Sequence, residues 1–72
     1  MSERILERRT TKGGRYEVEL VETNGVYNIV FKSNGKVTAT ACNYPSREAG
    51  YASFAKRINQ ARCIDGINYH RH

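Results

Sequence analysis

The chain is poor in the residues that form disulfides, membrane spans or rigid turns, with two cysteines, one proline and no tryptophan in 72 residues. Two cysteines are too few for the disulfide framework of a small secreted protein. We therefore expect Cys42 and Cys63 to be buried or half-buried thiols in a reducing compartment. The alternative is a single disulfide between them. No apolar run approaches the length of a transmembrane helix, and residues 1–6 lack the apolar core of a signal peptide. These absences favour a cytoplasmic protein with no membrane association.

Groups suited to catalysis or to metal binding are also scarce. The histidines, His70 and His72, lie at the end of the chain, and Cys42 and Cys63 are far apart in the sequence. Structural zinc sites usually contain close Cys-x₂₋₄-Cys pairs, and a nucleophilic cysteine needs a histidine beside it. A chain this short also has little room for a deep pocket. The sequence predicts no metal, no cofactor and no enzymatic activity.

The charge balance is strongly basic. Twelve Lys and Arg residues against seven Asp and Glu residues give a net charge of +5. Residues 1–15 and 32–72 hold all of the bases, whereas residues 16–31 hold three acids and no base. An excess of this size on a small protein favours an anionic partner, usually nucleic acid.

Two Asn-Gly pairs, Asn24-Gly25 and Asn34-Gly35, predict two tight reversals of the chain. A type I′ turn needs positive φ at both central positions, which Asn and Gly tolerate best. The flanking segments alternate apolar and polar residues with the period of two that is typical of half-buried strands. The apolar positions expected on one side of the sheet are Tyr16, Val18 and Leu20, then Tyr27, Ile29 and Phe31, then Val37, Ala39 and Ala41.

The period changes after Tyr44. Ser46 is suited to cap a helix, and Glu48 is suited to its first turn. Apolar residues then recur at helical spacing, which predicts a helix that covers the apolar side of the sheet, with Gly50 at a close approach between the two. The residues of this helical stripe are Tyr51, Phe54, Ala55, Ile58 and Ala61.

The fold class that follows is α+β, an antiparallel three- or four-stranded meander with one C-terminal helix packed on one face. Residues 1–72 are interpreted as a single domain, with the meander over residues 15–42 and the helix over residues 45–62. Residues 1–14 form either a first strand that pairs with the meander or a basic arm. Residues 63–72 form either a short edge strand or a loose tail. The other side of the sheet is expected to lack a covering element.

Several short motifs follow one another between residues 27 and 61. They are Phe31-Lys32-Ser33, the turn Asn34-Gly35, Tyr44-Pro45-Ser46-Arg47 and Gly50-Tyr51-Ala52-Ser53-Phe54. In this order they resemble the repeat of the YegP-like family of small bacterial proteins, although the helix start is shorter here and two helix residues are bulkier. The resemblance implies a β-β-β-α unit and no activity. Because family members often carry two such units packed together, it also makes a homodimer attractive.

Ten basic side chains are the candidate contacts to nucleic acid, since phosphate binding needs several cations on one surface. Lys32, Lys36 and Arg47 are expected near one end of the sheet. The glutamates of residues 17–22 carry the wrong charge to contact phosphate, so we expect the N-terminal segment and the helix edge to hold nucleic acid. The glutamates themselves either pair with the N-terminal arginines or contact a basic protein partner. The ten are Arg4, Arg8, Arg9, Lys12, Lys32, Lys36, Arg47, Lys56, Arg57 and Arg62.

The function expected from these features is non-catalytic binding by a small basic protein, as a nucleic-acid-associated accessory or regulatory factor that acts as a homodimer. The alternative is a protein–protein inhibitor or adaptor, for example a phage or mobile-element protein that blocks a host nuclease or defence complex. A small chain with an open sheet face or a free edge strand is suited to capping a partner in that way.

Overall fold

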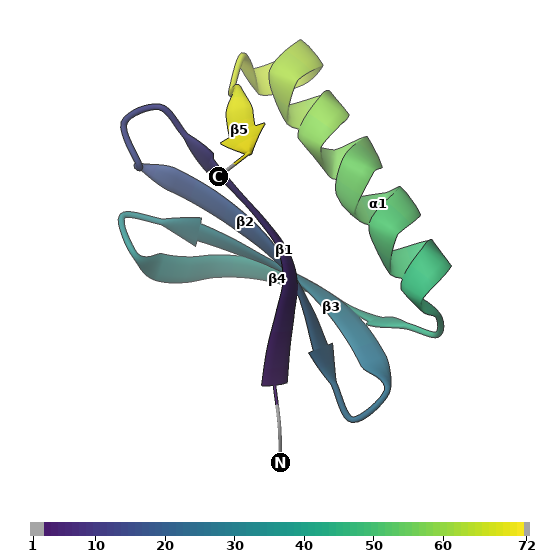
Figure 1. Ribbon diagram of the computed structural model, residues 1–72. Coiled ribbons are helices and arrows are strands. Elements are labelled where there is room, and N and C mark those ends of the chain that lie inside the picture. Colours follow the sequence, from purple (N-terminus) through teal and green to yellow (C-terminus); the bar gives the residue numbers. More distant parts are fainter. Residues whose placement is uncertain (1–2, 72) are drawn as a thin grey trace.

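The computed structural model describes residues 3–71, which form one five-stranded antiparallel sheet and one α-helix (Figure 1). The strand order across the sheet is β4-β3-β2-β1-β5. The elements in chain order are β1 (Glu3–Thr11), β2 (Tyr16–Thr23), β3 (Val26–Ser33), β4 (Lys36–Tyr44), α1 (Arg47–Gln60), the π-helical turn η1 (Ala61–Asp65) and β5 (Tyr69–Arg71). The expected antiparallel meander with one helix on one face is confirmed.

Both Asn-Gly pairs form the two-residue reversals that the sequence predicts. Asn24 and Gly25 have φ values of 52° and 79°, and Asn34 and Gly35 have values of 53° and 81°. Positive φ at both central residues is the requirement of a type I′ turn, whose twist matches that of the flanking strands. The two turns therefore set the register of β2 against β3 and of β3 against β4.

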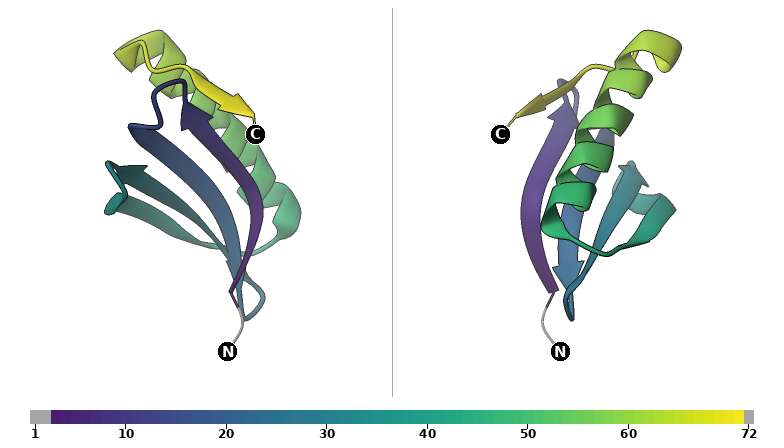
Figure 2. Two further views of the ribbon diagram at one scale, coloured as in Figure 1. Left: turned by 60° about the vertical axis from the view of Figure 1, so that its left-hand side comes forward. Right: turned by 90° about the vertical axis from the view of Figure 1, so that its right-hand side faces the viewer.

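The helix crosses one face of the sheet and leaves the opposite face without a covering element (Figure 2). Val18, Leu20 and Ile29 from the sheet are fully buried beneath Phe54 of α1. Ala55, which was expected in the helical stripe, is exposed instead. Further half-buried side chains surround the core, and they are Leu6, Tyr27, Phe31, Ala41, Tyr44, Tyr51, Ile58 and Tyr69.

Gly50 lies where α1 meets the sheet, as expected. A β-carbon at this position would lie 3.1 Å from Tyr27 Cβ and 3.3 Å from Leu20 Cδ1, which is closer than ordinary van der Waals contact. Glycine costs about 1 kcal/mol relative to alanine inside a helix. The close approach of the helix to the core explains why the chain carries glycine here. Ser46 caps the same end of α1, because its Oγ accepts a hydrogen bond from the Ala49 N–H at 3.1 Å.

Both chain ends join the sheet, so it has five strands rather than the three or four expected. The N-terminal segment is a strand and not an arm, since β1 pairs with β2 over most of its length. The tail supplies β5, which pairs with the outer edge of β1 through Thr11 and Tyr69. Gly66, with a φ of 67°, ends the helical segment and turns the chain back towards that edge.

The outer strand β4 contains two β-bulges. One register shift lies opposite Phe31 and Lys32, and the other lies near Asn43, which has a φ of 71°. The first bulge corrects an expectation: Val37 lies opposite Lys32, on the uncovered face, rather than beside Ala39 on the helix face. An extra residue in a strand reverses the side on which the following residues lie, and the apolar pattern alone does not reveal it.

Candidate nucleic-acid interface

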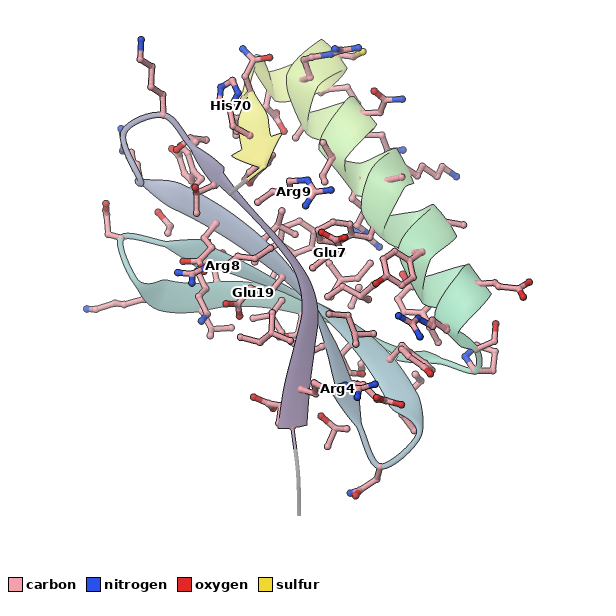
Figure 3. All side chains as sticks on the ribbon, viewed as in Figure 1. Arg4, Glu7, Arg8, Arg9, Glu19 and His70 are labelled. Carbon is pink, nitrogen blue, oxygen red and sulfur yellow. The ribbon has the colours of Figure 1, made fainter. Side chains whose placement is uncertain are left out.

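The basic side chains of β1 alternate between the two faces of the sheet (Figure 3). Arg8 lies on the uncovered face with Glu19, whereas Arg9 and Glu7 lie on the side of the helix. Arg4 forms an ion pair with Glu22 at 3.0 Å. The register of β1 against β2 decides these contacts, because it places Arg4 opposite Glu22 and Arg8 opposite Glu19.

The uncovered face carries a cluster of four charged side chains, Arg8, Glu17, Glu19 and Lys32. Arg8 Nε lies 2.5 Å from Glu17 Oε2 and 3.9 Å from Glu19 Oε2, and Lys32 Nζ lies 3.1 Å from Glu19 Oε1. The side chain of Glu19 is only 7% exposed although no helix or strand covers it. Charged side chains and their aliphatic stems bury one another here. Arg8 and Lys32 are thereby neutralised by their own glutamates.

Burial and neighbouring charges shift the pKa of the Glu17 carboxyl in opposite directions. Desolvation by burial raises the pKa of its carboxyl, but the Arg8 guanidinium, the neighbouring Glu19 carboxyl and the Lys32 ammonium together lower that pKa below its ordinary value of 4.5. A group whose pKa is lower in the folded state stabilises the fold above its unfolded pKa, and this contribution disappears as the pH falls through the folded pKa.

We therefore expect Glu17→Gln to flatten the loss of stability as the pH is lowered below about 5, because the substituted side chain no longer takes up a proton on unfolding. Urea unfolding followed by circular dichroism across this acid range measures the effect. Glu3→Gln, at an exposed position of β1, is the matched control. If the free energy of unfolding falls equally with decreasing pH in both variants, the prediction is contradicted.

Arg9 lies between β1 and the helix rather than in solvent. Its Nη1 lies 2.6 Å from Glu7 Oε1, and its guanidinium stacks 5.6 Å from the centre of the Phe54 ring. Both charged side chains are only 20% exposed. Arg9 therefore covers one edge of the core, which makes it a poor phosphate contact.

Six other cations gather at one end of the molecule, which we call the basic end. The antiparallel order places the β1–β2 turn and the β3–β4 turn at the same end of the sheet, and the C-terminal end of α1 lies there too (Figure 1). Each of these cations is exposed, and none forms a salt bridge within residues 3–71. They are Lys12, Arg15, Lys36, Lys56, Arg57 and Arg62.

Arg47 does not belong to this group, contrary to the expectation that it lies near Lys36. The two residues lie at opposite ends of β4, because Lys36 begins the strand and Arg47 follows its end. Nine residues of extended chain span roughly 30 Å. The guanidinium of Arg47 instead stacks 5.6 Å from the centre of the Tyr51 ring.

Arg15 is the member of the basic end that the sequence did not single out. It follows the Gly13–Gly14 turn and lies beside the Asn34–Gly35 turn because β2 pairs with β3: Tyr16 lies opposite Ser33, and the Asn34 N–H donates to the Arg15 carbonyl at 2.8 Å. The guanidinium of Arg15 stacks 5.2 Å from the centre of the Tyr16 ring.

The cysteines and the possible metal ligands of residues 3–71 form no second candidate site. Cys42 and Cys63 are free thiols, and both are exposed rather than buried or half-buried as expected, since one lies in the outer strand and the other in η1. Within the described residues no three His, Cys, Asp or Glu side chains come together as metal ligands. No described helix has the length and apolar character needed to cross a bilayer.

Comparisons of the chain with protein-family models, with curated proteins and with solved structures find no match. The resemblance of residues 27–61 to the YegP-like repeat therefore stays a prediction.

Proposed function

We propose that this protein is a non-catalytic nucleic-acid-binding protein, an accessory or regulatory factor whose basic end contacts the sugar-phosphate backbone. The observation that supports the proposal is which cations pair with acids. Arg4, Arg8, Arg9 and Lys32 are neutralised by glutamates, whereas the six cations of the basic end form no salt bridge within residues 3–71. Arg47 also forms no salt bridge there, but it lies alone at the opposite end of β4. Clustered, unpaired cations are what phosphate binding requires.

The basic end is also suited to such contacts in the reach of its side chains. Lys12 and Lys36 lie in or beside tight turns, where long side chains extend freely into solvent, and Arg62 lies in η1. Binding of this kind positions a protein on a phosphate backbone without reading base sequence. The free, exposed thiols of Cys42 and Cys63 agree with a reducing compartment, and thus with a cytoplasmic location.

The first test is the salt dependence of binding, measured by fluorescence anisotropy with labelled oligonucleotides. If about four cations contact phosphates, the affinity falls roughly 50- to 150-fold between about 50 and 200 mM salt, through release of counterions. Lys36→Glu is expected to weaken binding about tenfold at low salt, since it replaces one phosphate contact by a repulsion.

Arg47→Glu is the matched control for Lys36→Glu, because it makes the same change of net charge at the opposite end of β4. Screening over about 10 Å at 0.1 M salt confines its effect to roughly twofold or less. Equal losses in the two variants would contradict a localised basic end. Affinity that does not change with salt, or an absence of binding to single-stranded and duplex probes alike, would remove the proposal altogether.

The free edge of β4 is the feature that supports the second function, capping of a protein partner, and also a homodimer. Two bulges and Lys36 interrupt this edge, and these are devices by which edge strands avoid pairing with other chains. We therefore place nucleic acid first. Sedimentation equilibrium tests the homodimer, and capture of partners from nuclease-treated lysate tests the protein-binding alternative.

A further inference from the structure

A groove opens at the basic end, between the C-terminal part of the helical segment and the sheet. Its volume is about 550 Å³. The walls come from β2, β3, β4, α1, η1 and β5, and the tail completes one side of the groove with Ile67 and Tyr69. Its apolar and aromatic lining is formed by Tyr16, Phe31, Ala39, Ile64, Ile67 and Tyr69. We call it the aromatic groove.

The aromatic rings of the groove lie beside cations. The guanidinium of Arg57, which lines the groove, stacks 5.7 Å from the centre of the Phe31 ring. Arg15 is not a lining residue, but its guanidinium stacks on the ring of Tyr16, which is. The Tyr69 ring is half-buried, and burial raises the pKa of its hydroxyl further above physiological pH. The groove thus offers flat apolar surfaces beside the Arg57 guanidinium, and the Asp65 carboxyl lies next to Ile64 in its lining. The Ile64 side chain is 76% exposed.

Aromatic surfaces beside cations suit single-stranded nucleic acid better than a duplex. A duplex keeps the faces of its bases stacked inside and exposes only phosphates, sugars and base edges, so it cannot insert a base into an apolar recess. A single strand presents unstacked bases beside its phosphates, and proteins hold such bases on aromatic side chains within a positively charged groove. Arginine adds stacking on the free face of a base.

We propose, building on the proposed function, that the preferred ligand is single-stranded nucleic acid, with a base inserted in the aromatic groove and the flanking phosphates held by the cations of the basic end. Phe31, Tyr16 and Tyr69 supply the stacking surfaces. Arg57 and Arg15 stack on the inserted base or pair with its neighbouring phosphates. No base-specific hydrogen bond is required, so the binding tolerates any sequence.

The test compares a fluorescein-labelled thymidine homopolymer with a labelled hairpin duplex of equal charge, at one salt concentration. The single strand is expected to bind at least about tenfold more tightly, from stacking of one base. Tyr69→Leu keeps an apolar side chain but removes a stacking surface, so it is expected to weaken single-strand binding about tenfold and to leave duplex binding unchanged. Tyr51→Leu, which removes a ring that packs on the core outside the groove, is expected to change neither affinity.

A second pair of variants avoids any effect on folding, because both positions are exposed. Ile64→Glu places a carboxylate in the groove, whereas Ile5→Glu makes the same change of charge on β1, outside the groove. The ratio of single-strand to duplex affinity is expected to fall in Ile64→Glu and to stay constant in Ile5→Glu.

The outcomes separate this inference from the function on which it rests. Equal affinity for the two probes, or equal losses for both probes in Tyr69→Leu and Ile64→Glu, overturns the single-strand inference and leaves phosphate binding at the basic end intact. Absence of binding to both probes overturns the inference and the proposed function together.

Discussion

Leu20→Ala is expected to remove a large part of the stability of this protein, about 3–5 kcal/mol, the cost of deleting a fully buried leucine that leaves a cavity. A chain of 72 residues has a free energy of unfolding of only about 4–11 kcal/mol. Leu20 also lies against the helix, since a β-carbon added at Gly50 would lie only 3.3 Å from its Cδ1. The variant is therefore expected to be substantially unfolded at moderate urea concentration.

Urea unfolding followed by circular dichroism measures this loss, and Val37→Ala is the matched control. Val37 is a large aliphatic residue of the same sheet that is 59% exposed, so its truncation is expected to cost less than about 0.5 kcal/mol. If Leu20→Ala cost no more than Val37→Ala, the helix would not pack on the face that holds Val18, Leu20 and Ile29.

Lys32→Met is expected to destabilise the fold by about 2–3 kcal/mol, because it leaves the buried carboxylate of Glu19 without its nearest cation. Removing one partner of a fully buried ion pair costs about 3–5 kcal/mol. The effect is smaller here, since Lys32 is 28% exposed and Arg8 stays 3.9 Å from Glu19. The free energy of unfolding from urea titration at neutral pH gives the size of the loss.

The double variant Lys32→Met/Glu19→Gln is the diagnostic control for this prediction. Replacing both charges removes the stranded carboxylate, so the double variant is expected to recover most of the stability lost in Lys32→Met. A loss that is simply additive would show that the two side chains act independently. The same pair bears on function: Lys32 is engaged on the uncovered face, and it is therefore not counted among the cations of the basic end.

Much of the fold could be predicted because its signals are local. Asn34-Gly35 specifies a reversal through the φ angles that these two residues tolerate, and Ser46 specifies a helix start through one side-chain hydrogen bond. The alternation around Leu20 and Ile29 likewise identified the buried side of the sheet from neighbouring residues alone. Gly50 was correctly placed at the contact between helix and sheet, since glycine inside a helix needs a packing reason.

The candidate site was harder to predict, because its decisive contacts join residues far apart in the chain. Ten cations were equivalent in the sequence, and only strand register separates Arg8, which meets Glu17 and Glu19, from Lys12, which meets no acid in the described chain. The aromatic groove is completed by Ile67 and Tyr69, which lie in the tail that returns to pair with β1. Val37 changed face through a bulge that no pattern of apolar residues announces.

The amino-acid sequence by itself determined the two hairpin turns, the buried face of the central strands and the single helix, because each depends on the conformational preferences of adjacent residues. Tertiary structure alone decided which cations are neutralised, which end of the sheet carries the surplus charge and which side chains line the groove. These follow from strand register and strand order, which bring distant residues to within a few ångströms and which the energy of the whole fold selects.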